Sequence, residues 1–252
     1  MQIKYHKEYS THLGRDMEYK TYGHAGQALI AFPTMHGNFW QWEDLGMINA
    51  LSELINDGRI QVFTVDGIDS ETVKSGDWDK LKSIKRYDQY MNYMQKELLP
   101  RVLDTSNYVN GQSDAKAWTT GASMGAMHAA NFFFHNPWQI NGLIAMSGAY
   151  AMRHFFGDYL PDDIYRWSPL DYLHGSFIDN RWQELQKAKI AFICGQGAWE
   201  EPGITDTKLI GEVLAERDIP AWIDLWGHDV EHDWPQWQKQ LPYVLNKLLG
   251  GE

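Results

Sequence analysis

The chain has 252 residues, of which 44% are hydrophobic and 22% are charged, and its formal net charge at pH 7 is −11. This length and composition suit one α/β domain with a sizeable core. The acidic balance argues against nucleic acid or an anionic membrane as a partner, since both require a basic patch, and the one cysteine, Cys194, excludes an internal disulfide.

Short apolar runs alternate with helical patterns in the N-terminal half, which is typical of a mainly parallel sheet covered by helices. The first two strands are amphipathic, and the next two should be buried. We expect strands at 3–9, 16–22, 28–32 and 60–65, helices at 43–56 and 87–103, and a long polar loop at 66–78.

The C-terminal half continues the alternation, with strands at 117–120, 142–146, 190–194 and 221–225 and helices ending near 135, over 206–217 and from 233 onward. Residues 147–187 have no clear period and are expected to pass over the sheet edge. No repeat or linker is recognised, so residues 1–252 are predicted to form one domain. We therefore predict a three-layer α/β/α sandwich whose mostly parallel sheet of about eight strands has the first hairpin as its antiparallel edge.

The segment Gly121-Ala122-Ser123-Met124-Gly125 matches G-x-S-x-G. In this motif a serine occupies a strained turn between a strand and a helix, and the flanking glycines let the backbone pass. A short apolar strand precedes the motif here and an Ala-rich helix follows it. This context predicts that Ser123 is a nucleophile and not an ordinary turn residue.

A serine hydroxyl needs a base, which in this strand order lies after the last strand. His228 and His232 both fit, and His232 is preferred because it stands directly before the final helix. His128 follows Ser123 by five residues and is expected to pack beneath the turn. A metal site formed by His228 and His232 is disfavoured, because the pair lies in a predicted loop and no Glu follows His228 directly.

The acid that orients the base should follow the strand at 190–194. Glu200 is the first choice, Glu201 the second and Asp206 the third. No glycine-rich phosphate motif or metal site is recognised, so no cofactor is expected.

The oxyanion hole needs two backbone N–H groups. One should belong to Met124, the residue after the nucleophile, and the other to the loop at 34–38, with Met35 as our choice. His36 and Trp40 are candidate substrate contacts. Further aromatic residues that could wall the pocket are Phe155, Phe156 and Tyr159.

The chain resembles the esterase family of α/β hydrolases, which includes esterase D-like and feruloyl-esterase-like enzymes and the mycolyltransferases. The resemblance is carried by Leu13-Gly14-Arg15-Asp16-Met17, by residues 121–129, by Ser147-Gly148-Ala149-Tyr150 and by His232-Asp233-Trp234-Pro235-Gln236-Trp237. It implies Ser123 as nucleophile, His232 as base, Glu200 as acid and no cofactor. The loop Thr34-Met35-His36-Gly37 departs from the commoner Gly-rich forms.

From the residues and this resemblance together we predict a cytoplasmic serine esterase that acts on a small-molecule carboxylic ester and that could form a homo-oligomer. Two alternatives stay open. One is an acyltransferase with the same triad, and the other is a non-catalytic binding protein that keeps the fold. The absence of a signal-peptide pattern in Met1-Gln2-Ile3-Lys4-Tyr5-His6-Lys7 underlies the expected location.

Overall fold

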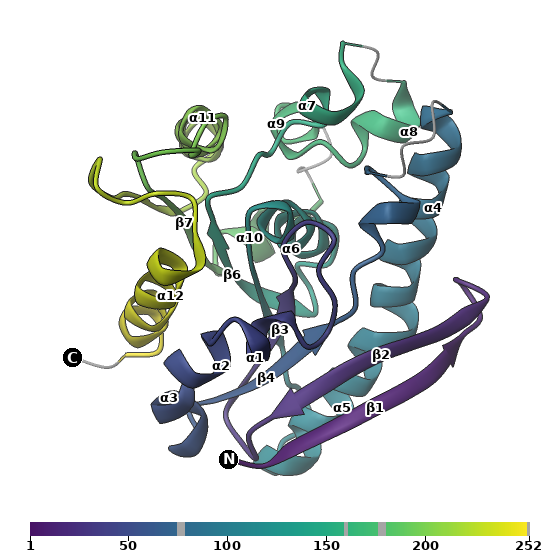
Figure 1. Cartoon of the computed structure of the whole chain (residues 1–252), viewed down its shortest axis with the longest axis vertical. Coiled ribbons are helices and arrows are strands. Elements are labelled where there is room, and N and C mark those ends of the chain that lie inside the picture. Colours follow the sequence, from purple (N-terminus) through teal and green to yellow (C-terminus); the bar gives the residue numbers. More distant parts are fainter. Residues whose placement is uncertain (75–78, 159–160, 176–179, 251–252) are drawn as a thin grey trace.

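A computed structural model describes residues 1–74, 79–158, 161–175 and 180–250 of the chain (Figure 1). Its eight strands form one sheet in the order β1-β2-β4-β3-β5-β6-β7-β8. The strands are β1 (Ile3–Ser10), β2 (Arg15–Tyr22), β3 (Gln27–Phe32), β4 (Ile60–Val65), β5 (Ala117–Ala122), β6 (Ile140–Met146), β7 (Lys189–Cys194) and β8 (Trp222–Leu225).

The direction of the strands confirms the predicted mostly parallel sheet. β2 pairs in antiparallel fashion with both β1 and β4, and every other neighbouring pair is parallel. β2 therefore runs against the other seven strands, and the β1–β2 hairpin forms the antiparallel edge that the sequence predicted.

Helices cover both faces of the sheet, which confirms the three-layer architecture. Leu29 and Ala31 of β3 face one core, whereas Ile30 and Phe32 face the other, as the alternation of side chains along a strand requires. The first core is closed by α2 (Met47–Ala50), α3 (Ser52–Asn56) and α12 (Trp234–Leu248), and the second by α4 (Lys80–Tyr93), α5 (Leu99–Asn110), α6 (Met124–His135) and α11 (Gly203–Glu216).

The helix predicted over 43–56 is divided into α1 (Gln41–Asp44), α2 and α3. The first break lies at Gly46, whose φ of 78° is left-handed. Glycine adopts this conformation without steric cost, so the chain can turn there. Apolar residues at helical spacing do not reveal such a break, because the buried positions Met47, Leu51 and Ile55 keep facing the core.

The helix predicted over 87–103 is longer than expected. α4 continues through a π-helical turn, η2 (Met94–Leu98), directly into α5. Pro100 lies in the first turn of α5, where it cannot donate an α-helical hydrogen bond and its ring crowds the preceding turn. The wider π-turn immediately before Pro100 is a common way for a helix to absorb this disruption.

Residues between β6 and β7 form short helices, as expected of a segment that passes over the sheet edge. Three of them lie together at the top of Figure 1, namely α7 (Arg153–Phe156), α8 (Asp162–Tyr165) and α9 (Pro169–Tyr172), and α10 (Trp182–Leu185) leads into β7. A short 3₁₀ helix, η1 (Asp69–Glu71), occupies part of the stretch predicted as a polar loop. Within the described ranges, no helix has the length and apolar character that crossing a membrane requires.

The order of the central strands places a crevice at their carboxyl ends. From β3 the chain passes through α1–α3 on one face to β4, and then through α4 and α5 on the opposite face to β5, on the other side of β3. Connections that diverge in this way leave an opening above β3 and β5, where α/β proteins bind ligands. Ser123 directly follows β5 at this point.

Asp66, the residue after β4, is a buried carboxyl group that helps to shape this end of the sheet. Its side chain accepts a hydrogen bond from the Phe39 N–H at 3.2 Å, and the residue is 7% exposed. Burial raises the pKa of Asp66 to about 6, because its backbone hydrogen-bond donors compensate only part of the lost hydration. The neutral form of Asp66 is therefore the one that favours the folded state.

This raised pKa predicts a pH-dependent contribution to stability. The contribution of neutral Asp66 should be complete below about pH 4, the unfolded-state pKa, and should be lost as the pH rises through about 6. Asp66→Asn cannot ionise and can still accept from Phe39. Relative to wild type, its free energy of unfolding should rise between pH 4 and pH 7 by up to about 3 kcal/mol, measured by urea denaturation. A difference that stays constant over this range would contradict the prediction.

Candidate active site

Three side chains from loops after different strands meet above the carboxyl ends of β5, β7 and β8. His232 Nε2 lies 2.9 Å from Ser123 Oγ, and His232 Nδ1 lies 3.0 Å from Glu200 Oε2. Glu200 is 1% exposed and the His232 side chain is 23% exposed, so the chain of contacts leads from the protein interior to an accessible hydroxyl. A carboxylate, an imidazole and a hydroxyl in this order can activate the hydroxyl as a nucleophile.

The turn at Ser123 explains why both flanking glycines are needed. Ser123 has φ 56° and ψ −124°, a conformation that non-glycine residues rarely adopt. A Cβ on Gly121 would lie 2.2 Å from the Gly125 carbonyl oxygen, and one on Gly125 would lie 2.4 Å from that of Pro33. The turn thus packs backbone against backbone and holds Ser123 at the start of α6.

The loops that carry Glu200 and His232 are joined by backbone hydrogen bonds. The Gly197 N–H donates to the Val230 carbonyl at 2.8 Å, and the His232 N–H donates to the Ala198 carbonyl at 3.0 Å. Side-chain packing adds to this, because the Trp237 and His232 rings pack in a T-shaped arrangement, with centroids 5.0 Å apart and planes at 86°. Backbone hydrogen bonds and ring packing together therefore restrict the position of the imidazole.

Glu200 is surrounded by hydrogen-bond donors. Its Oε1 accepts from the Ser147 hydroxyl at 2.9 Å and from the Gly195 N–H at 3.1 Å, and the Cys194 thiol lies 3.5 Å from Oε2. Trp237 Nε1–H in turn donates to Ser147 Oγ at 3.0 Å. Buried carboxylates require such partners, so this pocket holds Glu200 in one orientation toward His232.

Sequence reasoning missed Ser147 and Trp237 as members of this site. Both lie in segments that carry the family resemblance, after β6 and at the start of α12. Ser147 also has a positive φ of 52°, which marks a constrained position but cannot be read from a single sequence.

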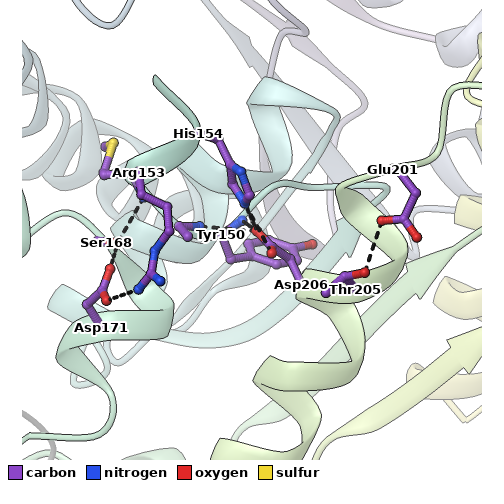
Figure 2. Close-up of polar contacts among 10 residues, drawn as sticks. Tyr150, Arg153, His154, Ser168, Asp171, Glu201, Thr205 and Asp206 are labelled. Atoms are coloured by element: carbon purple, nitrogen blue, oxygen red, sulfur yellow. Dashed lines mark hydrogen bonds and ion pairs between the residues drawn. The ribbon is translucent and has the colours of Figure 1, made fainter. Parts of the chain in front are cut away.

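The other two acid candidates have different partners, as Figure 2 shows. Asp206 accepts from the Tyr150 N–H at 2.6 Å and contacts His154 Nε2 at 2.9 Å. Glu201 accepts from the Thr205 hydroxyl at 3.1 Å. His228, the second candidate base, is exposed, and its Nδ1 lies 3.2 Å from the Gln196 carbonyl oxygen. Of the sequence-based candidates, Ser123, His232 and Glu200 are the ones that the fold brings together.

The loop at 34–37 presents one unused backbone donor. The Thr34 N–H donates to Gln41 Oε1 at 2.8 Å, the His36 N–H to Asp69 Oδ2 at 3.0 Å, and the Gly37 N–H to the Thr34 carbonyl at 2.8 Å. Among the described residues, the N–H groups of Met35 and Met124 make no hydrogen bond. These two groups are the predicted oxyanion donors, and both residues line the cavity beside Ser123.

A cavity of about 210 Å³ opens at Ser123 and His232. Phe155 from α7 contributes to its wall, and Lys74 Nζ lies over the Phe155 ring at 5.3 Å from its centroid. The further lining residues come mainly from the segments that follow β3, β6 and β7, namely Met35, Met124, Ser147, Ala149, Trp199, Glu200, Glu201, Pro202 and Gly203.

The remaining substrate-contact candidates lie elsewhere. His36 and Trp40 are not among the residues that line this cavity. The His36 ring contacts Ser70 Oγ at 3.1 Å, and Trp40 packs edge-on against Phe39. Phe156 is buried in the core, and Tyr159 lies outside the described residues. A substrate contact by His36 or Trp40 therefore stays a prediction. In the described part of the chain, no cluster of three or more His, Cys, Asp or Glu side chains is arranged to hold a metal ion.

Comparison with known proteins identifies the family. The family model described as "Putative esterase" matches residues 10–248. A ferulic acid esterase structure superimposes with a TM-score of 0.73 at 16% identity, covering 98% of both chains. An S-formylglutathione hydrolase from Staphylococcus aureus has a TM-score of 0.65 at 11% identity, covering 99% of this chain and 97% of that one.

A ferulic acid esterase from the anaerobic fungus Anaeromyces mucronatus has a TM-score of 0.69 at 13% identity, covering 99% of this chain and 91% of that one. No curated protein sequence matches the chain. The structural likenesses bear on the fold, and the family match extends over nearly the whole chain. The chain therefore belongs to the esterase family and is a carboxylic ester hydrolase of the α/β-hydrolase fold.

Proposed function

We propose that the protein hydrolyses a small carboxylic ester through an acyl-enzyme formed on Ser123, with His232 as general base and Glu200 as the acid of the triad. The observation that carries this proposal is the continuous hydrogen-bonded chain from Glu200 through His232 to Ser123, with distances of 3.0 and 2.9 Å. A catalytic serine requires a base in direct contact and a group that orients the base.

In the first step, His232 Nε2 takes the proton of Ser123 Oγ while Oγ attacks the ester carbonyl carbon. His232 can accept this proton only if its own hydrogen is on Nδ1, and the Glu200 carboxylate at 3.0 Å favours that tautomer. The same carboxylate stabilises the imidazolium that forms. The N–H groups of Met124 and Met35 are proposed to bind the negative oxygen of the tetrahedral intermediate.

In the second step, the intermediate collapses and the ester's C–O bond breaks. His232 returns the proton to the leaving alcohol, and the acyl group stays on Ser123 Oγ. Water then gives a proton to His232 and attacks the acyl carbon. When this second intermediate collapses, the carboxylic acid leaves and Ser123 regains its proton.

The cavity points to a small substrate. Its volume of about 210 Å³ is below the range of roughly 300–1,000 Å³ typical of sites for drug-sized ligands. Apolar side chains, among them Met35, Phe155 and Pro202, supply much of the wall. We therefore propose an ester with a compact, mainly apolar acyl group, and p-nitrophenyl acetate is a suitable first substrate.

Ser123→Ala should lower kcat for p-nitrophenyl acetate by about 10³-fold or more, because the variant cannot form the acyl-enzyme. Ser106→Ala is a matched control, since it removes a buried hydroxyl on α5, away from the site. The control should keep wild-type kinetics. Equal rates for Ser123→Ala and wild type, with both proteins folded by circular dichroism, would refute the proposed nucleophile.

Adjacent carboxylates allow a direct test of the acid. Glu200→Gln should lower kcat about a thousandfold, because an amide nitrogen facing His232 favours the wrong tautomer. Glu201→Gln should lower kcat by no more than about tenfold, because Glu201 lies at the exposed wall of the cavity, accepts from Thr205 and has no hydrogen bond to His232 among the described residues. If Glu201→Gln lowered kcat more than Glu200→Gln in steady-state kinetics, Glu201 and not Glu200 would be the acid of the triad.

A further inference from the structure

The buried carboxylate–imidazole pair of Asp69 and His128 takes no part in the proposed triad. His128 Nε2 on α6 is 2.9 Å from Asp69 Oδ1 at the start of η1. The two residues are 2% and 3% exposed. Burying a carboxylate costs free energy unless hydrogen-bond donors compensate the lost hydration. The groups that this pair contacts therefore indicate what the pair does.

The pair ends a chain of buried hydrogen bonds. Asn131 Nδ2 lies 3.5 Å from the Tyr87 hydroxyl, which lies 3.0 Å from His128 Nδ1. Burial raises the pKa of Tyr87 well above its usual value, so its hydroxyl keeps the proton and donates to Nδ1. His128 then carries its hydrogen on Nε2 and donates to Asp69, and the chain is polarised in one direction, toward the carboxylate.

Asp69 is charged at the end of this chain. Burial raises the pKa of Asp69, but its contacts with His128 and the hydrogen bond of the His36 N–H outweigh burial and hold the pKa of Asp69 below its ordinary value. The carboxylate thus uses both oxygens, Oδ1 for His128 and Oδ2 for the His36 N–H at 3.0 Å.

The contact with His36 reaches the proposed oxyanion hole. His36 has a φ of 59°, and it immediately follows Met35, whose N–H is the unused donor of the loop. Two side chains hold the backbone N–H groups of the residues on either side of Met35: Gln41 accepts from the Thr34 N–H, and Asp69 accepts from the His36 N–H. Asp69 is the charged member of this clamp.

We infer that Asp69, oriented by His128 and Tyr87, is a positioning residue that fixes the backbone of residues 34–36 so that the Met35 N–H points at the oxygen that becomes negative in the transition state. This inference rests on the proposed function. The clamp makes no contact with the substrate, so it should act on the transition state and hardly on substrate binding. Its loss should lower kcat and leave KM nearly unchanged.

Asp69→Asn tests the clamp without changing the size of the side chain. The amide supplies one acceptor oxygen in place of two and carries no charge, so the loop loses its charged anchor. We expect kcat for p-nitrophenyl acetate to fall by about 10- to 100-fold, less than the loss of an oxyanion donor itself, with KM changed by less than about threefold. Affinity for an arylboronic acid, which mimics the tetrahedral intermediate, should fall by the same factor as kcat.

The Asp206–His154 pair supplies a matched control (Figure 2). Asp206 is also 3% exposed, contacts an imidazole at 2.9 Å and accepts backbone N–H groups, those of Tyr150 and Ala151, but it does not touch residues 34–37. Asp206→Asn changes the same kind of buried contact, and it should leave both KM and the affinity for the boronic acid unchanged. Asp69 would be merely structural if both variants lost this affinity equally.

Tyr87→Phe keeps the inference testable if Asp69→Asn does not fold. This variant removes the hydroxyl that donates to His128 and leaves the carboxylate in place, so kcat and boronic acid affinity should fall together by about three- to tenfold. A folded Asp69→Asn or Tyr87→Phe with wild-type kcat and boronic acid affinity would overturn the inference. That result would leave the proposed function standing, because it is Ser123→Ala that tests the nucleophile.

Discussion

The hydrogen bond between Ser123 Oγ and His232 Nε2 requires parts of the chain that are distant in sequence to meet above one end of the strands. Parallel strands make this possible, because their carboxyl ends all lie at the same end of the sheet. The tight turn at Ser123 raises its hydroxyl, and the backbone bonds from Gly197 to Val230 and from His232 to Ala198 align the loops after β7 and β8. An added methyl group at Gly121 or Gly125 would collide with backbone, so the turn leaves little freedom in where Ser123 points.

Polar groups buried around this bond give the site its rigidity. Glu200 faces His232 and is fixed by Ser147 and the Gly195 N–H, while Ser147 is itself bonded to Trp237. On the other side of Ser123, the chain that ends at Asp69 reaches the loop of Met35. In both arrangements one oxygen of a buried carboxylate contacts an imidazole and the other accepts a backbone N–H, that of Gly195 for Glu200 and that of His36 for Asp69. Fixed donors are effective in ester hydrolysis because they need no rearrangement when charge develops on the carbonyl oxygen.

Much of this could be read from the sequence, because the relevant signals are local. Amphipathic patterns predicted the first two strands and apolar runs the other six, and the G-x-S-x-G pentapeptide between a strand and a helix singled out Ser123. His232 and Glu200 followed from the order in which this fold places its base and acid. The breaks that the structure reveals come from single residues within a periodic pattern, Gly46 in the first helical region and Pro100 after the π-turn. The partners of Glu200 could not be predicted, because Ser147 and Trp237 are distant in sequence and meet only through the fold.

Covalent labelling tests the central claim, the activated Ser123 hydroxyl, most directly. The folded protein is treated with a fluorophosphonate, and the modified peptide is located by mass spectrometry. The expected result is one adduct, on Ser123, which is lost in Ser123→Ala and forms much more slowly in His232→Ala, because the hydroxyl then lacks its base. An adduct on another residue, no adduct on the folded protein, or equal labelling rates with and without the imidazole would contradict the account.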